Sequence, residues 1–144
     1  PIYSIREIVR TIPKDFVQVS DAGRVVKIRE ALLPVIEIRE TLGEINWENI
    51  SEMKYKAKEE NNSLRARREE EMVIIIESMH GMMALPVDEV IGQAQVVVKP
   101  ITTGKQIPEV SGAAILGDGR TVLILDPIAL TQKKSPELNK ELSA

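Results

Sequence analysis

Apolar and charged residues alternate along several short stretches of this chain. Within residues 25–29 and 33–40, Val26 and Ile28, and then Ile36 and Ile38, alternate with charged side chains. A period of two is typical of antiparallel strands with one buried face. Both stretches are therefore predicted to be strands, connected by Arg29-Glu30-Ala31, with Pro34 at the start or edge of the second one.

Four further stretches rich in aliphatic residues continue the pattern. One strand each is predicted over residues 72–78, 113–116 and 121–125. Residues 82–101 are long enough for two strands, or for a strand, a corner and another strand. About seven short strands, with turn signals roughly every 8–12 residues, predict an all-β sandwich or barrel. Residues 2–10 fit a strand or a short helix, and the spacing of their apolar side chains slightly favours a helix at their end.

Two regions differ in composition from these strands. Residues 44–71 contain similar numbers of acidic and basic side chains and few that could join a core, so a charged, flexible loop is predicted, with Trp47 anchoring its first end. In the tail, residues 133–144, Ser135-Pro136 resembles a helix start. The predicted organisation is one domain over residues 1–132, in which the loop separates the strand-rich parts 1–43 and 72–132, followed by the polar tail.

The composition narrows the range of functions. The chain has 144 residues, 43% of them hydrophobic, a net charge of −3 and no cysteine. An acidic chain lacks the basic surface of a general nucleic-acid-binding protein, and without cysteine there is no disulfide, thiol nucleophile or thiolate metal site. No apolar run approaches the roughly 20 residues that span a membrane. A soluble, intracellular protein is expected, without nucleic-acid binding or membrane insertion.

The stretch Gly117-Asp118-Gly119 is the first candidate for chemistry. A phosphate-binding loop would need a lysine and a hydroxyl side chain at the start of a helix, but Arg120 and a strand-like run follow here. A calcium loop would need more oxygen ligands than Asp118 alone. Asp-Gly between two apolar runs is a strong hairpin signal because both residues tolerate positive φ. We therefore predict a structural turn.

Other reactive side chains lack the partners that catalysis requires. His80, the one histidine, precedes Gly81 in a predicted turn, and no partner for proton transfer is visible near it. Asp88 and Glu89 are adjacent, so on a strand their side chains point to opposite faces. Ser111 lacks the context of a nucleophilic serine. The sequence thus predicts no catalytic residue, metal site or cofactor. The methionines at 79, 82 and 83 fit either core filling or an adaptable contact surface.

Four segments in order carry a resemblance to a known family. They are "PIYSIREIVR" (1–10), "IREALLPVIEIRETLG" (28–43), "ALPVDEVIGQAQVVVKPI" (84–101) and "VSGAAILGDGRTVLILD" (110–126). Each is similar to a motif of the CheW-like domain of bacterial chemotaxis, and the last two resemble the regulatory domain at the C-terminus of CheA histidine kinases more than free-standing CheW.

The resemblance implies an all-β fold of two SH3-like β-barrel subdomains. It also implies a non-catalytic adaptor at cytoplasmic receptor arrays, which binds CheW and/or a CheA regulatory domain and the cytoplasmic tip of chemoreceptors, coupling receptor state to kinase activity. The resemblance assigns receptor contact to Ile5 and Glu7, which match the V-x-E of the family pattern, and to Arg29 in the following turn. If residues 5–7 are extended, Ile5 and Glu7 can share one face; alternatively, Ile5 belongs to the core and Arg29 is merely solvated.

Two departures from the family pattern affect this expectation. The Arg-Gly turn of the family is Arg29-Glu30 here, so a glycine suited to positive φ is lost and the turn is expected to be rebuilt. The strands that open the family pattern before "PIYSIREIVR" are missing, which implies a trimmed chain or a barrel with an open edge. A stand-alone CheW protein is the alternative within the family, and a small β-barrel enzyme is a remote alternative.

Overall fold

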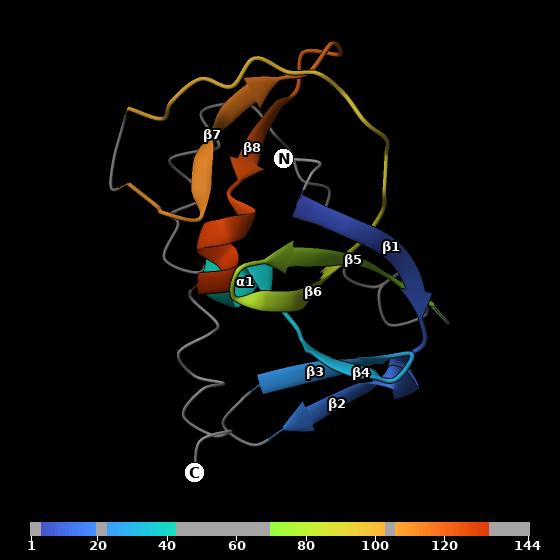
Figure 1. The fold of residues 1–144 in the computed structure, drawn as a ribbon. Coiled ribbons are helices and arrows are strands. Elements are labelled where there is room, and N and C mark those ends of the chain that lie inside the picture. Colours follow the sequence, from blue (N-terminus) through green and yellow to red (C-terminus); the bar gives the residue numbers. More distant parts are fainter. Residues whose placement is uncertain (1–3, 20–22, 43–69, 103–105, 133–144) are drawn as a thin grey trace.

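Residues 4–19, 23–42, 70–102 and 106–132 are described by the computed structural model, and strands dominate these ranges (Figure 1). All named strand pairs are antiparallel and form three small sheets. The predicted all-β class is therefore confirmed. In chain order the elements are β1 (Ile5–Thr11), the short 3-10 helix η2 (Pro13–Asp15), β2 (Phe16–Val19), β3 (Gly23–Ile28), β4 (Ala31–Pro34), α1 (Ile38–Thr41), β5 (Glu71–Ser78), β6 (Gly81–Val87), β7 (Val110–Ile115) and β8 (Thr121–Leu125), with a last helical turn over residues 127–132.

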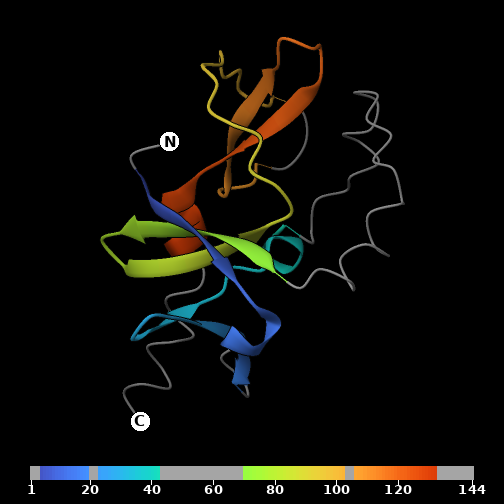
Figure 2. The same cartoon turned by 90° about the vertical axis from the view of Figure 1, so that its right-hand side faces the viewer.

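The central sheet has the strand order β1-β5-β6 and is covered on both faces. On one face Val73 and Ile75 join a cluster with residues of β3 and β4, while on the other Ile76 packs with Met83 and Leu130. Because both faces are buried, β5 is apolar at consecutive positions instead of alternating. In Figures 1 and 2 this sheet lies between the β2-β3-β4 sheet and the β7-β8 hairpin.

The β2-β3-β4 sheet packs its inner face on the central sheet. Val26 and Leu33 are opposite each other on β3 and β4, and both are buried in the shared cluster. After β4 the chain crosses to the central sheet: Val35 forms a parallel bridge with Ala84, and the Ile36 N–H donates to the Ala84 carbonyl at 2.8 Å. This crossing fixes the two sheets against each other.

The prediction of a continuous strand over residues 33–40 is wrong for its second half. Pro34 ends β4 instead of starting it, and residues 38–41 form the short helix α1. Ile36 lies in the second core cluster and Ile38 packs against it. The spacing of Ile36 and Ile38 therefore reflects their packing at the crossing and in a helical turn, and not the buried face of a strand.

The strand over 72–78, the following turn and the last hairpin are confirmed. Met79 and His80 form the turn between β5 and β6, and β7 and β8 cover the predicted arms of the hairpin. The structure places Met83 in the core at 2% exposure, whereas Met79 is 90% exposed. Met83 therefore fills the core, whereas a contact-surface role for the exposed Met79 stays a prediction.

Of the two alternatives for residues 2–10, the strand is confirmed over Ile5–Thr11, and the slight preference for a helix is wrong. The second strand expected within residues 82–101 is also wrong: after β6, residues 88–101 contain only an isolated bridge between Lys99 and Ala113. Lys99 lies beside Gly112, where an added Cβ atom would be 2.6 Å from the Lys99 carbonyl oxygen. The segment thus crosses the hairpin at close range. The predicted loop over 44–71, with Trp47, and the tail helix after Ser135 lie outside the described residues, apart from Glu70 and Glu71.

The turn at Gly117-Asp118-Gly119 has a three-residue hairpin geometry. The Leu116 N–H donates to the Arg120 carbonyl at 2.8 Å, the Gly119 N–H donates to the Leu116 carbonyl at 2.9 Å, and Gly119 has φ +84°. Such loops place one residue in the left-handed region, usually glycine. Within this turn it is Gly119, and not Asp118, that adopts positive φ.

Candidate functional site

Glu7 and Arg29, two of the three residues predicted to contact a partner, form an ion pair. Glu7 lies on β1, and Arg29 lies in the turn between β3 and β4. The Arg29 guanidinium donates two hydrogen bonds, from Nη1 to Oε1 at 2.9 Å and from Nη2 to Oε2 at 2.8 Å. This paired geometry fixes the orientation of both groups. It joins the rim of the central sheet to the rim of the β2-β3-β4 sheet.

The backbone at Arg29 explains how the side chain reaches Glu7. Ile28 and Ala31 are paired, so Arg29 and Glu30 are the two central residues of the turn. Tight hairpin turns need positive φ at the first central residue, and Arg29 has φ +56°. The left-handed conformation is uncommon for a side chain of this size. The turn that lacks the family's glycine is therefore built with the arginine itself in the left-handed conformation.

The pair shifts the ionisation of both residues in the direction of the charged forms. The hydrogen bonds from Arg29 are the main cause that lowers the pKa of the Glu7 carboxyl group, and Glu7 in turn raises the pKa of the Arg29 guanidinium. The Arg29 side chain is 73% exposed and that of Glu7 is 30% exposed. Solvent screens an exposed pair strongly, so its contribution to stability is small. The pair therefore contributes little to holding the two sheets together.

Ile5 does not share a face with Glu7, contrary to the expectation for an extended strand. The register places Ile5 opposite Ile76 but Glu7 opposite Ile75, with an irregularity between the two β1 residues. One extra residue, Arg6, therefore interrupts the alternation as a β-bulge does. Ile75 and Ile76 belong to clusters on opposite faces of the central sheet. Ile5 is 38% exposed, so it is not a core residue either.

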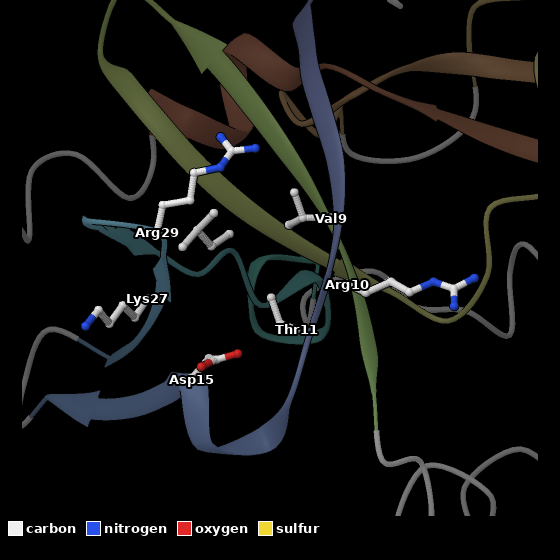
Figure 3. A pocket seen from close by; sticks show the side chains of 7 residues that line it. Val9, Arg10, Thr11, Asp15, Lys27 and Arg29 are labelled. Carbon is white, nitrogen blue, oxygen red and sulfur yellow. The ribbon is translucent and has the colours of Figure 1, made fainter.

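An open depression of about 390 Å³ lies between β1 and β3, next to Arg29 (Figure 3). In the figure, Val9 and Thr11 point from β1 into this space and Asp15 points toward β1, whereas Arg10 and Lys27 point away from it. Its lining residues are Val9, Arg10, Thr11, Asp15, Lys27, Ile28 and Arg29. Sequence reasoning missed all of these except Arg29, because only the packing of one sheet on another brings residues 9–15 and 27–29 together.

Asp118 and Ser111 have structural partners for their side chains. Asp118 accepts hydrogen bonds from the Arg120 backbone N–H and guanidinium, which lower its pKa, the backbone bond most. The Ser111 hydroxyl donates to the Ile124 carbonyl at 3.1 Å, and the His80 backbone N–H donates to Ser78 Oγ. Within the described ranges, no cluster of three or more histidine and acidic side chains could hold a metal ion, and no helix is long and apolar enough to cross a membrane.

Comparison with known proteins decides the family. The sequence pattern of the CheW-like domain matches residues 1–135. This chain belongs to the CheW-like domain family. Over 131 residues it is 29% identical to the chemotaxis protein CheA of Salmonella typhimurium, covering 90% of this chain and 17% of the relative. It is 30% identical to CheA of Cereibacter sphaeroides over 128 residues, covering 88% and 16% respectively.

A shorter match is more similar in sequence. CheA of Halobacterium salinarum is 45% identical over 62 residues, which are 41% of this chain and 9% of that protein. The chain therefore spans about one sixth of the length of the first two relatives and less of this third one. The similarity covers a CheW-like regulatory domain, and the family supports a coupling role in chemotaxis signalling.

Proposed function

We propose that this chain is the regulatory domain of a chemotaxis histidine kinase and acts as a non-catalytic adaptor. It binds CheW and the cytoplasmic tip of a chemoreceptor, and thereby couples receptor state to a kinase activity that lies elsewhere in the parent protein. The observation that carries the proposal is the match of the CheW-like domain to residues 1–135, together with similarity to CheA over about 90% of the chain. We also propose that the chain is located at receptor arrays on the inner face of the membrane.

We assign receptor contact to the surface around Glu7 and Arg29. The exposed Arg29 side chain and the partly exposed Glu7 side chain meet at the junction of two sheets, where a partner can touch both sheets at once. Charged groups at the rim of an interface select partners and fix orientation more than they add affinity. Ile5 is partly exposed and lies on the face of β1 opposite to Glu7. In this proposal, Ile5 therefore contacts the receptor from that opposite face.

The direct test is a pull-down of the purified chain with CheW and with a receptor cytoplasmic fragment. The adaptor hypothesis predicts that both are retained. The charge-reversing variant Glu7→Lys is expected to lose receptor binding while keeping the circular dichroism spectrum of the parent. Failure of the wild-type chain to retain either partner would contradict the proposed function.

A matched control is available on the same sheet. Arg6 and Glu77 form another exposed ion pair, with Nη1 and Oε2 2.8 Å apart. Glu77→Lys reverses one charge of this pair, as Glu7→Lys does at the proposed surface. Equal loss of receptor binding in both variants would indicate a general charge effect and would remove Glu7 from the interface.

Two alternatives are distinguished by simple observations. A stand-alone CheW coupling protein would have no ATP-binding motifs elsewhere in its complete sequence, whereas a CheA kinase would contain them. A small β-barrel enzyme would need a cluster of polar side chains, and mutating these side chains would abolish its turnover. The relatives described above are named chemotaxis protein CheA, which favours the kinase domain over the first alternative.

A further inference from the structure

Asp118 is the one aspartate of the chain that glycine follows, and it lies in the exposed turn between β7 and β8. Its side chain is 51% exposed, and apart from the chain neighbours of Gly119 no atom lies within 4 Å of the Cβ position there. The backbone nitrogen of the next residue can attack the side-chain carboxyl carbon of an aspartate, and a glycine hinders this attack least because it has no side chain. Asp118-Gly119 therefore combines the sequence and the exposure that this reaction needs.

Hydrogen bonds in the folded turn oppose the attack. The Gly119 N–H, whose nitrogen is the nucleophile, donates to the Leu116 carbonyl at 2.9 Å. Asp118 Oδ1 accepts the Arg120 backbone N–H at 3.0 Å, and Oδ2 accepts from Arg120 Nε at 2.6 Å. The backbone bond first, and then the guanidinium bond, lower the pKa of the Asp118 carboxyl group. Both bonds therefore favour the ionised carboxylate, whereas ring closure proceeds from the protonated acid.

We propose that Asp118 is a site of spontaneous isomerisation to isoaspartate, and that the Arg120 side chain restrains this reaction. In the first step the Gly119 nitrogen forms a bond to Cγ of the protonated Asp118 side chain. The carboxyl hydroxyl leaves as water together with the amide proton, which closes a five-membered succinimide ring. Water then adds to either ring carbonyl. Opening at Cγ restores aspartate, and opening at the main-chain carbonyl leaves isoaspartate, whose backbone runs through Cβ and Cγ.

The product does not fit the observed turn. Isoaspartate adds one carbon to the main chain and leaves a free carboxylate on Cα. The three-residue loop is closed by the Leu116 N–H, which donates to the Arg120 carbonyl at 2.8 Å, and by the Gly119 N–H, which donates to the Leu116 carbonyl. A longer main chain between these groups disturbs both bonds. Isomerisation is therefore expected to open the tip of the hairpin and to lower the urea midpoint of the modified chain.

The other aspartates within the described residues are less suited to this reaction. Phenylalanine follows Asp15 and glutamate follows Asp88, and their side chains hinder the attack. Proline follows Asp126, so the nucleophilic N–H is missing there. Asp88 is exposed, as Asp118 is, and it lies outside any helix or strand. It therefore serves as the internal reference for exposure alone.

The test incubates the folded chain for several weeks at pH 6 and 25 °C, with circular dichroism to check that it stays folded. Mass spectrometry with electron-transfer fragmentation then locates isoaspartate, which is expected at residue 118 and not at Asp88. The blocked peptide acetyl-Leu-Gly-Asp-Gly-Arg-Thr-amide lacks the fold and is expected to isomerise faster than the chain. Arg120→Gln is expected to isomerise about two- to fivefold faster than the wild type, as for the loss of one exposed ion pair.

Two variants separate the role of Arg120 from a general charge effect. Arg120→Lys keeps a cation beside Asp118 and is expected to isomerise at nearly the wild-type rate. Arg6→Gln removes the exposed ion pair with Glu77 on the central sheet, so its rate is expected to equal that of the wild type.

Several outcomes would overturn the proposal. They are an unchanged rate in Arg120→Gln, an equal acceleration in Arg6→Gln, as much isoaspartate at Asp88 as at Asp118, and a folded wild-type chain that isomerises as fast as the peptide. Absence of isoaspartate from both the wild type and Arg120→Gln would also overturn it. None of these results depends on whether the chain binds CheW or a receptor.

Discussion

Replacing Gly112 by alanine tests how closely the segment after β6 crosses the β7-β8 hairpin. An added Cβ atom would lie 2.6 Å from the Lys99 carbonyl oxygen and 2.6 Å from Val98 Cγ1. Real Cβ contacts essentially never become this short. The Val98 side chain can rotate away, but the backbone oxygen can move only if the crossing segment moves. We therefore expect the alanine variant to push residues 98–99 off β7.

The cost follows from the bonds that this movement breaks. The Lys99 N–H donates to the Ala113 carbonyl at 2.8 Å, and the Ala113 N–H donates to the Lys99 carbonyl at 2.9 Å. Each bond contributes roughly 0.5–1.5 kcal/mol net, so losing both lowers the free energy of unfolding by about 1–3 kcal/mol. If the crossing holds instead, overpacking costs about the same, roughly 1–3 kcal/mol. Either route predicts a destabilisation of about 2 kcal/mol.

Urea unfolding followed by circular dichroism measures this difference. A small domain has a slope of about 1–3 kcal/mol per molar urea, so the midpoint of Gly112→Ala is expected to fall by about 1 M. Gly117→Ala is the matched control, because Gly117 has open space around its Cβ position and no positive φ. Equal midpoints for the two variants would refute the close crossing.

Three further predictions concern the turn, the core and the ion pair. Gly119→Val should destabilise the chain by roughly 1–3 kcal/mol, because valine is strained at φ +84°; an unchanged melting temperature would count against this turn. Ile75→Ala, at a site 1% exposed between two sheets, should cost about 2–5 kcal/mol in urea unfolding, and a loss below 1 kcal/mol would show that Ile75 is poorly packed. Folding lowers the pKa of the Glu7 carboxyl group, so the stability that its pairing contributes is present above the ordinary pKa of about 4.3 and disappears as the pH falls through the folded pKa. The difference in unfolding free energy between wild type and Arg29→Gln should therefore shrink from pH 7 to pH 3. A difference that stays constant with pH would contradict the pairing.

The sequence pattern predicted the strands whose environment is simple. β7 and β8 flank an Asp-Gly turn, and β5 is a run of β-branched residues, so hairpin and strand signals were enough for them. The bulge in β1 explains one error. Ile5 and Ile8 are opposite Ile76 and Ile74, on the same face, although three positions separate them. One extra residue in the strand therefore produced a spacing that resembles a helix.

The candidate site was predictable only in part, for a related reason. Glu7 and Arg29 were selected by resemblance to family motifs, and their pairing across two sheets follows from the way the β3–β4 turn meets β1. Periodicity carries no information about contacts between elements that are distant in sequence. The depression formed by Val9, Asp15 and Ile28 depends on such contacts, so no local pattern could have indicated it.

Binding of a chemoreceptor cytoplasmic fragment to charge-swapped variants tests the central claim most directly. Isothermal titration calorimetry would compare the wild type with Glu7→Arg, Arg29→Glu and the double variant, which restores an ion pair with reversed polarity. If the pair is a recognition surface, both single variants and the double variant bind more weakly than the wild type although the double variant is fully folded. Wild-type affinity in all three folded variants would contradict the assignment of receptor contact to this surface, and no binding by the wild type would contradict the adaptor function itself.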